Sequence, residues 1–89
     1  MIRRKLTVIN RLGLHARAAA KLVSTASSFS STLQIAANGH TVDAKSIMGI
    51  MMLAGSCDTV VEITANGEDE AAAMDTIEEL FNDYFGEGG

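Results

Sequence analysis

The chain has 89 residues, of which 47% are apolar, which suits one small globular domain and excludes an intrinsically disordered chain. A domain of this size has no room for a deep enclosed active site, so any chemistry is expected at its surface. The net charge is −4, but the charges are segregated along the chain. Residues 1–45 contain all seven Lys and Arg residues and one acid, and the remaining ten acids lie after them. A face built from the first half is therefore expected to be positive and to suit an acidic partner or a phosphate.

Cysteine content and hydropathy predict where the protein works. The single cysteine, Cys57, allows no disulfide within the chain, which fits a reducing compartment. The N-terminus lacks the apolar stretch of a signal peptide, and no apolar run is long enough to span a bilayer. We therefore expect a cytoplasmic protein without membrane insertion. Aromatic residues make up 4% of an acidic chain, so stacking platforms are scarce and no nucleic-acid partner is expected.

The first half of the chain predicts a strand, a helix and a hairpin. Residues 4–10 alternate polar and apolar side chains, as a strand does. After the connection RLGLH, the spacing becomes helical from Ala16 and is rich in alanine, the best helix former. Residues 31–44 predict two strands, because Asn38-Gly39 is the preferred pair for a type I′ turn.

The second half predicts a short helix, a strand and a long helix. Residues 45–55 are apolar without strict alternation, and Ser46 is a good N-cap, so a short helix is favoured over a buried strand. Residues 59–65 alternate as a strand, and residues 66–86 predict a helix with acids in its first turn and Gly86 as its C-cap. The final GEGG is expected to be a frayed tail.

This order, β-α-β-β-α-β-α, predicts the fold class. Four strands with three helices between and after them imply an α+β two-layer sandwich, with the helices on one face of the sheet and water on the other. The chain contains no internal repeat and no linker. We therefore expect a single domain spanning residues 1–89.

His15 is the first candidate for chemistry, because it stands where the first helix is expected to begin. The amides of Ala16 and Arg17 then lack intrahelical acceptors and form an anion site together with the helix dipole. The Arg17 guanidinium can hold phosphate oxygens. These positive groups disfavour an imidazolium, so the ring is expected to be neutral and nucleophilic near neutral pH. By spacing alone, however, a histidine near a helix start is more often structural or inert.

No further catalytic machinery is visible in the sequence. It contains no P-loop pattern, no Ser/His/Asp set and no cluster of metal ligands, so no metal or cofactor is expected. The second histidine, His40, falls at the hairpin turn and is interpreted as a solvated loop residue. The residues therefore favour a carrier of phosphoryl groups, whose larger partners do the catalysis, over a free-standing catalyst.

The segments GLHAR, AAKLV, AKSIMGIMML and GEDEAAAM follow one another in this order and resemble the HPr family of histidine-containing phosphocarriers of the bacterial phosphotransferase system. The resemblance spans nearly the whole chain. It implies the HPr-like open-faced sandwich, whose antiparallel sheet has the strand order 1-4-2-3. It also implies that Nδ1 of His15 accepts a phosphoryl group from enzyme I and passes it to an enzyme IIA-type domain, for sugar uptake and regulation. Arg17 would interact with the phosphoryl group.

The resemblance further implies a docking surface on the first helix and the short second helix. Here it would consist of Ala20, Ser24, Ile47, Met48 and Met51. Core packing is the alternative for the two methionines, although methionine adapts well to several partners. A positive rim would speed the encounter with acidic partners and would consist of Arg11, Lys21 and Lys45.

Two positions need separate comment. Ser46 matches the residue that an HPr kinase/phosphorylase modifies in some family members, and it can serve as an N-cap as well. The family pattern usually reads HARP, whereas this chain has Ala18 and no proline. Proline is tolerated in the first helical turn because its missing N–H has no intrahelical partner there. Alanine keeps that N–H and loosens φ slightly, so the helix geometry is expected to survive, while the rigidity of the turn and the transfer rate remain open.

Two other functions remain open from the sequence. A regulatory phosphocarrier of a nitrogen-linked or carbon-regulation branch would use the same His15 chemistry. A binding module without phosphorylation would use the Met48 and Met51 patch alone, and the intact pair of His15 and Arg17 argues against it. In each case a monomer is expected.

Overall fold

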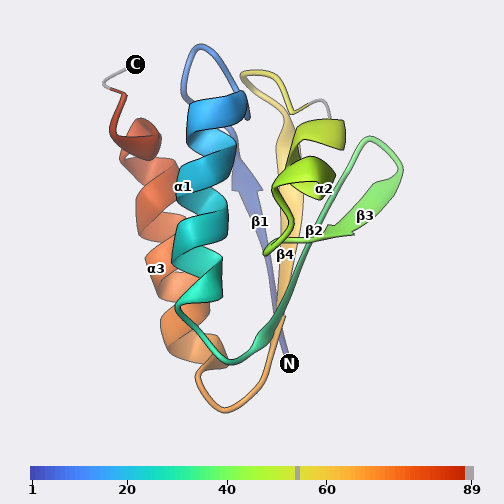
Figure 1. Cartoon of the computed structure of the whole chain (residues 1–89), viewed down its shortest axis with the longest axis vertical. Coiled ribbons are helices and arrows are strands. Elements are labelled where there is room, and N and C mark those ends of the chain that lie inside the picture. The colour runs from blue at the N-terminus through green and yellow to red at the C-terminus, as the bar shows by residue number, and fades with distance from the viewer. Residues whose placement is uncertain (54, 88–89) are drawn as a thin grey trace.

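The computed structural model describes residues 1–53 and 55–87, which form four strands, three α-helices and one short 3₁₀ helix in two layers (Figure 1). The strands are β1 (Ile2–Thr7), β2 (Thr32–Ala37), β3 (His40–Asp43) and β4 (Val60–Asn66). The helices are α1 (Ala16–Ser27), α2 (Ile47–Met52), α3 (Glu70–Asn82) and the 3₁₀ helix η1 (Tyr84–Gly86). The predicted order of elements is confirmed, and η1 is an addition to it.

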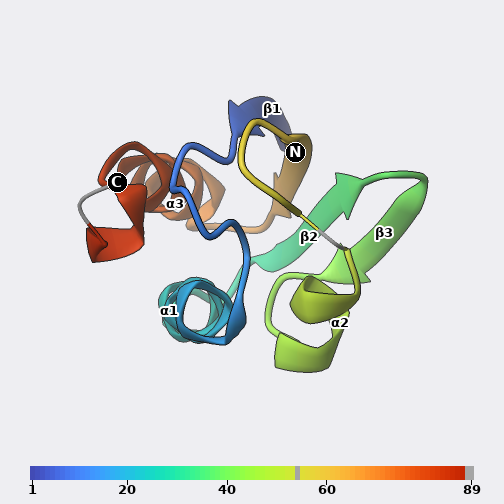
Figure 2. The same ribbon diagram turned by 90° about the horizontal axis from the view of Figure 1, so that it is seen from above.

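The sheet is antiparallel throughout, with the strand order β1-β4-β2-β3 that the resemblance implied. Its register pairs Leu33 with Ala65 and Ile35 with Ile63, and all four side chains are fully buried. Figure 2 shows the three helices on one side of the sheet. The expected open-faced α+β sandwich is therefore confirmed.

The apolar stripes of the two long helices fill the space over the sheet. Helix α3 buries Met74, Ile77 and Phe81 at helical spacing. Helix α1 buries four residues at helical spacing, and these are Ala18, Ala19, Leu22 and Ala26. Ala18 is fully buried in the first turn of a regular helix, which confirms that alanine supports helix formation at this position. Among the described residues, no helix is both long and apolar enough to cross a membrane.

The hairpin between β2 and β3 has the turn that its sequence predicts. Asn38 and Gly39 both adopt a positive φ, 52° and 81°, as a type I′ turn requires. His40 follows at the start of β3 and is exposed, as expected of a solvated residue.

The C-terminal end differs from the prediction. Helix α3 ends at Asn82 instead of continuing to Gly86, and the next residues turn back into η1. Phe85 is fully buried against Phe81, with ring centroids 4.8 Å apart, and Lys21 Nζ donates to the Phe85 carbonyl oxygen at 2.7 Å. These contacts hold η1 beside the first turns of α1 (Figure 1). The expectation of a frayed tail is therefore wrong for residues 86–87, while residues 88–89 lie outside the described part.

Candidate functional site

The loop between β1 and α1 places His15 at the start of the helix. Gly13 adopts a left-handed φ of 67°, and a Cβ there would overlap the carbonyl oxygen of Gly55, so the loop requires glycine at this point. The next residue, Leu14, is buried and donates its N–H to that same carbonyl at 2.7 Å. The loop is thereby held against the segment that leads into β4.

Asn10 fixes the other end of this loop. Its side chain is completely buried, and Nδ2 donates to the Gly13 carbonyl oxygen at 2.7 Å and to Glu87 Oε1 at 3.0 Å. The Gly13 N–H donates back to the Asn10 carbonyl oxygen at 3.0 Å. Asn10 therefore joins the loop that carries His15 to the C-terminal end of the chain. Sequence reasoning missed this residue, although an asparagine ending an apolar run was a signal.

His15 is the N-cap of α1. Its backbone is extended, with φ −73° and ψ 179°, and its carbonyl oxygen accepts the N–H of Ala19 at 2.8 Å, the first hydrogen bond of the helix. The ring nitrogen Nδ1 accepts the Arg17 N–H at 3.4 Å, a long hydrogen bond. Nδ1 therefore faces the first-turn amides, and an anion attached to it would meet the positive end of the helix dipole. The Arg17 amide is one of the two amides that the sequence predicts to form an anion site at this helix end.

The other ring nitrogen of His15, Nε2, forms a hydrogen-bonded pair with Glu87 Oε2. The Glu87 side chain is 7% exposed, against 27% for His15. Burial raises the pKa of Glu87, but the hydrogen bonds from Asn10 and His15, with the charges of His15 and Arg17, outweigh it and leave the pKa below its usual value. Glu87 is therefore an anion at neutral pH. Sequence reasoning missed it, because it treated this end of the chain as frayed.

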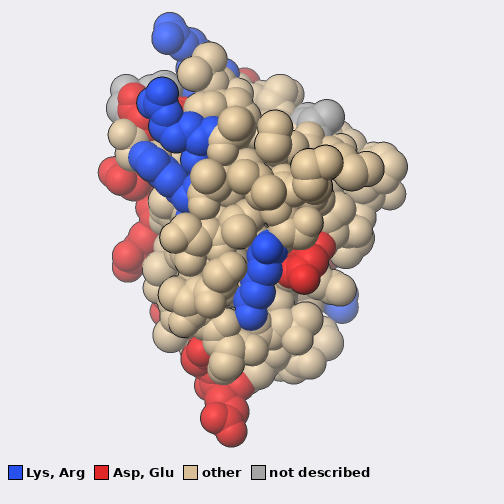
Figure 3. Space-filling view, viewed as in Figure 1, with Lys and Arg blue, Asp and Glu red and all other residues tan. Residues whose placement is uncertain are grey.

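The Arg17 side chain is exposed at the same end of α1. Its guanidinium forms no hydrogen bond or ion pair with another side chain in the described part of the chain. Figure 3 shows Lys and Arg atoms gathered over the upper part of the molecule, where α1 begins. The amide of Arg17 and its guanidinium thus offer two different kinds of donor near Nδ1.

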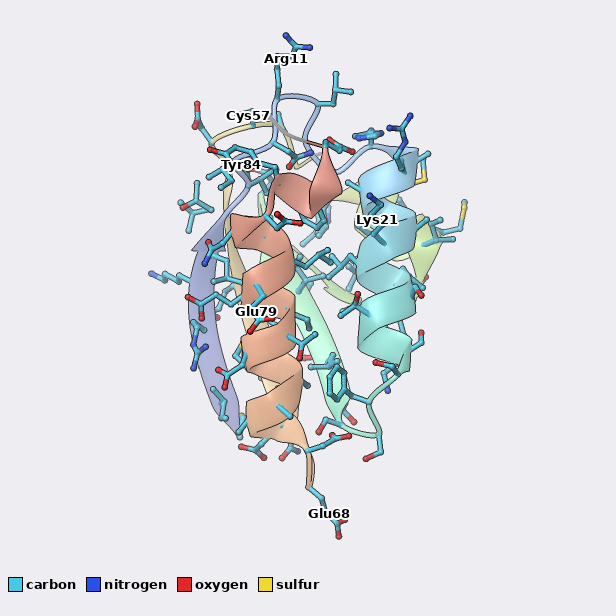
Figure 4. All side chains as sticks on the ribbon, turned by 90° about the vertical axis from the view of Figure 1, so that its left-hand side faces the viewer. Arg11, Lys21, Cys57, Glu68, Glu79 and Tyr84 are labelled. Atoms are coloured by element: carbon cyan, nitrogen blue, oxygen red, sulfur yellow. The ribbon has the colours of Figure 1, made fainter. Side chains whose placement is uncertain are left out.

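The expected positive rim is only partly free for partners. Arg11 projects from the tip of the loop (Figure 4). Lys21 and Lys45 instead donate to the carbonyl oxygens of Phe85 and Phe29, at 2.7 and 2.8 Å. These two lysines therefore also stabilise the ends of neighbouring segments.

Ser46 caps α2 as predicted. Its Oγ accepts the Gly49 N–H at 3.2 Å, and its carbonyl oxygen accepts the Ile50 N–H at 3.0 Å. Ile50 is the buried residue of this short helix. The helix is therefore anchored by one apolar side chain and one cap.

The residues expected to form the docking surface are exposed on neighbouring helices. Met48 and Met51 are 69% and 48% exposed, so they lie at the surface and the alternative of core packing is wrong. Ile47, Ala20 and Ser24 are exposed as well, and α1 packs beside α2. This surface is largely uncharged in Figure 3, where few blue or red atoms interrupt it.

Comparison with known proteins identifies the family. The family model described as "PTS HPr component phosphorylation site" matches residues 2–83. The chain belongs to the HPr family. It is 52% identical to the phosphocarrier protein HPr of Xylella fastidiosa strain Temecula1, over 98% of each chain. It is therefore a phosphocarrier of the phosphotransferase system.

Solved HPr structures have the same fold. The crystal structure of HPr-C-His from Thermoanaerobacter tengcongensis matches with a TM-score of 0.94 and 44% identity, over 98% of each chain. A second structure from that organism, described as an HPr dimer, matches with a TM-score of 0.79 and 44% identity, over 98% of this chain and 100% of that one. The sheet order and the three helices are thus those of HPr structures.

Proposed function

We propose that this HPr accepts a phosphoryl group on Nδ1 of His15 from phospho-enzyme I and passes it to an enzyme IIA-type domain. The observation that carries the proposal is the position of the ring at the N-terminus of α1. Nδ1 lies against the Arg17 N–H, while Nε2 is engaged by a carboxylate. One ring nitrogen is therefore directed at the helix end that favours anions.

The chemistry needs orientation and charge stabilisation more than acid–base catalysis. Nδ1 attacks phosphorus with its lone pair, and the bond between phosphorus and the donor breaks with its electron pair returning to the donor. The amides of Ala16 and Arg17, with the Arg17 guanidinium, face the charge on the phosphoryl oxygens. The helix dipole adds about 0.3–1 kcal/mol at an exposed site. Onward transfer repeats the step, with an acceptor histidine as the nucleophile.

The surface of α1 and α2 is the proposed docking site for both enzymes. Flexible methionine side chains suit two different partners, and the exposed Met48 and Met51 provide them beside Ala20, Ser24 and Ile47. Arg11 would favour the approach of acidic partner surfaces. We propose that the protein acts as a single-domain monomer in the cytoplasm, in sugar uptake and its regulation. Light scattering on the purified protein tests the monomer, since the second Thermoanaerobacter structure is a dimer.

Ser46 is the proposed site of regulatory phosphorylation by an HPr kinase/phosphorylase. Its hydroxyl lies at the N-terminus of α2, two residues from the exposed Met48. A phosphate there would be tolerated by the helix end and would place about two negative charges beside the docking surface. Incubation with the kinase and ATP, using Ser24→Ala as the unmodified-site control, should label the wild type and spare Ser46→Ala.

The test of the main proposal is phosphorylation by enzyme I and phosphoenolpyruvate. The expected product is an acid-labile, base-stable phosphoramidate, which His15→Ala should lack and His40→Ala should retain, because His40 is exposed on β3. Absence of the product from the wild type, or equal labelling of His15→Ala, would contradict the proposal. A phosphocarrier of a regulatory branch would use the same step. The identity of the IIA-type domain that accepts the phosphoryl group fastest distinguishes that role from sugar uptake.

A further inference from the structure

The last described residues form a docked segment, here called the C-terminal strap (residues 84–87). Tyr84 and Phe85 both adopt a left-handed backbone, with φ of 56° and 53°, which is unfavourable for residues other than glycine. The burial of Phe85 and its carbonyl's hydrogen bond from Lys21 hold the segment in this conformation. Figure 4 shows the strap beside the first turns of α1. An undocked terminus would not retain two such residues in succession.

The strap delivers one carboxylate to the imidazole of His15. Glu87 uses both of its oxygens: Oε1 accepts from Asn10 Nδ2 at 3.0 Å, and Oε2 pairs with His15 Nε2. Asn10 is itself fixed by the Gly13 carbonyl oxygen, 2.7 Å away. The carboxylate is therefore oriented from the loop on one side and binds the ring on the other.

We propose that Glu87 is a positioning residue for His15. Its carboxylate accepts the N–H of Nε2 and so selects the tautomer in which Nδ1 carries the lone pair. In proteins, the hydrogen bond made by one imidazole nitrogen commonly sets the role of the other. The Arg17 N–H, which donates to Nδ1, requires the same tautomer from the opposite side of the ring. Two independent hydrogen bonds thus require the same tautomer, in which Nδ1 carries the lone pair and is the reactive nitrogen.

The inference deepens the proposed function and rests on it, because it concerns the same transfer. When the bond between Nδ1 and phosphorus forms, the bond to the donor breaks and its electron pair leaves with the donor. The ring keeps its Nε2 proton and becomes a cation, so no proton has to enter or leave. Glu87 then faces that cation through the hydrogen bond it already makes. The carboxylate lies on the Nε2 side and leaves Nδ1 open to phosphorus.

The first test observes the proton on Nε2 in the unphosphorylated protein. Correlation spectra of nitrogen-15-labelled protein should show this proton protected from exchange with water in the wild type. Glu87→Ala should lose the signal, whereas Glu79→Ala should keep it, since Glu79 is an exposed acid on α3 (Figure 4). The same signal in Glu87→Ala as in the wild type would overturn the proposal. This arm does not depend on any phosphotransfer enzyme.

The second test measures the rate of phosphorylation by phospho-enzyme I. Glu87→Ala should lower kcat about 10-fold, the effect of one hydrogen bond to a charged group, with KM nearly unchanged because the docking surface is intact. Glu87→Gln keeps a hydrogen-bond acceptor but no charge, so its kcat should lie between those of the wild type and Glu87→Ala. Melting curves check that both variants fold. A variant without the Nε2 signal but with the wild-type rate would also refute positioning. Failure of the wild type to accept phosphate would instead refute the proposed function.

Discussion

Replacing Phe85 with alanine is expected to detach the C-terminal strap from the body of the protein. Phe85 is the fully buried side chain of the strap, and its ring packs on Phe81 with the two planes inclined by 56°. The strap's other contacts are hydrogen bonds from Lys21 and from the Asn10 side chain and the pairing with His15. The aromatic ring therefore supplies most of the apolar burial that offsets the left-handed backbone.

The expected loss of stability follows from three terms. A Phe→Ala change in a rigid core costs about 3–5 kcal/mol of the free energy of unfolding. The strap can detach instead of leaving a cavity, and this relieves two left-handed residues at about 1–2 kcal/mol each. Detachment also removes the strap's hydrogen bonds, at about 1 kcal/mol each. The lost hydrogen bonds and the relieved backbone roughly cancel, so the net loss should be about 3–5 kcal/mol, which lowers Tm by about 20 °C in a domain of this size.

Urea and thermal unfolding followed by circular dichroism measure this loss. Tyr84→Ala is the matched control, because Tyr84 has the same left-handed backbone but is 40% exposed. It should change the free energy of unfolding by less than about 1 kcal/mol. Phe85→Ala should also lose the protected Nε2 proton of His15. A Phe85→Ala protein as stable as the wild type, with that proton intact, would show that the strap is not held as described.

Three further predictions concern the loop, the cap and the last helix. Gly13→Ala should lower Tm and slow phosphorylation in parallel assays, because φ of 67° costs alanine about 1–2 kcal/mol and the new Cβ would overlap the Gly55 carbonyl oxygen. Ser46→Ala should cost about 0.5–2 kcal/mol in urea unfolding, while Ser46→Asp, an equally good N-cap, should cost little, and equal losses in both would contradict the capping role. Hydrogen bonds, of which the one from the Ser31 hydroxyl is the strongest, lower the pKa of Asp69 from 3.8 to about 2. The ionised carboxylate therefore stabilises the fold at a pH above the pKa that Asp69 has in the unfolded chain, and this stabilisation is lost as the pH falls through about 2. The difference in stability between the wild type and Asp69→Asn should therefore narrow on acidification, and a difference that does not depend on pH would refute this.

The elements could be predicted because their periodicity records burial directly. The alternating residues Leu33 and Ile35 lie in the core, and the turn pair at Asn38 and Gly39 needed no tertiary information. Ser46 was predictable as a cap because capping is a local interaction. The sheet order was different, since periodicity does not say which strands pair, and it followed from the family resemblance alone.

The strap and its contacts could not be predicted in the same way. Helical spacing allows either Tyr84 or Phe85 on the buried face after Phe81, whereas the structure buries Phe85 only after the chain has left the helix at Asn82. The pairing of His15 with Glu87 joins residues 72 positions apart, and a single polar pair leaves no periodic trace in a sequence. Asn10 is similar, because one of its two hydrogen-bond partners, Glu87, lies 77 positions away in the sequence.

The position of Glu87 changes what the charge distribution means for the site. The sequence separates basic residues in the first half from acidic ones in the second, which predicts a positive face built from the half that contains His15. The fold instead brings one acid from the second half to Nε2, while the helix amides and Arg17 lie on the side of Nδ1. The imidazole therefore lies between a negative and a positive side. In the proposed transfer, a phosphoryl group on Nδ1 would meet the positive side and the ring cation would meet the negative one, so each new charge would face an opposite charge that is already in place.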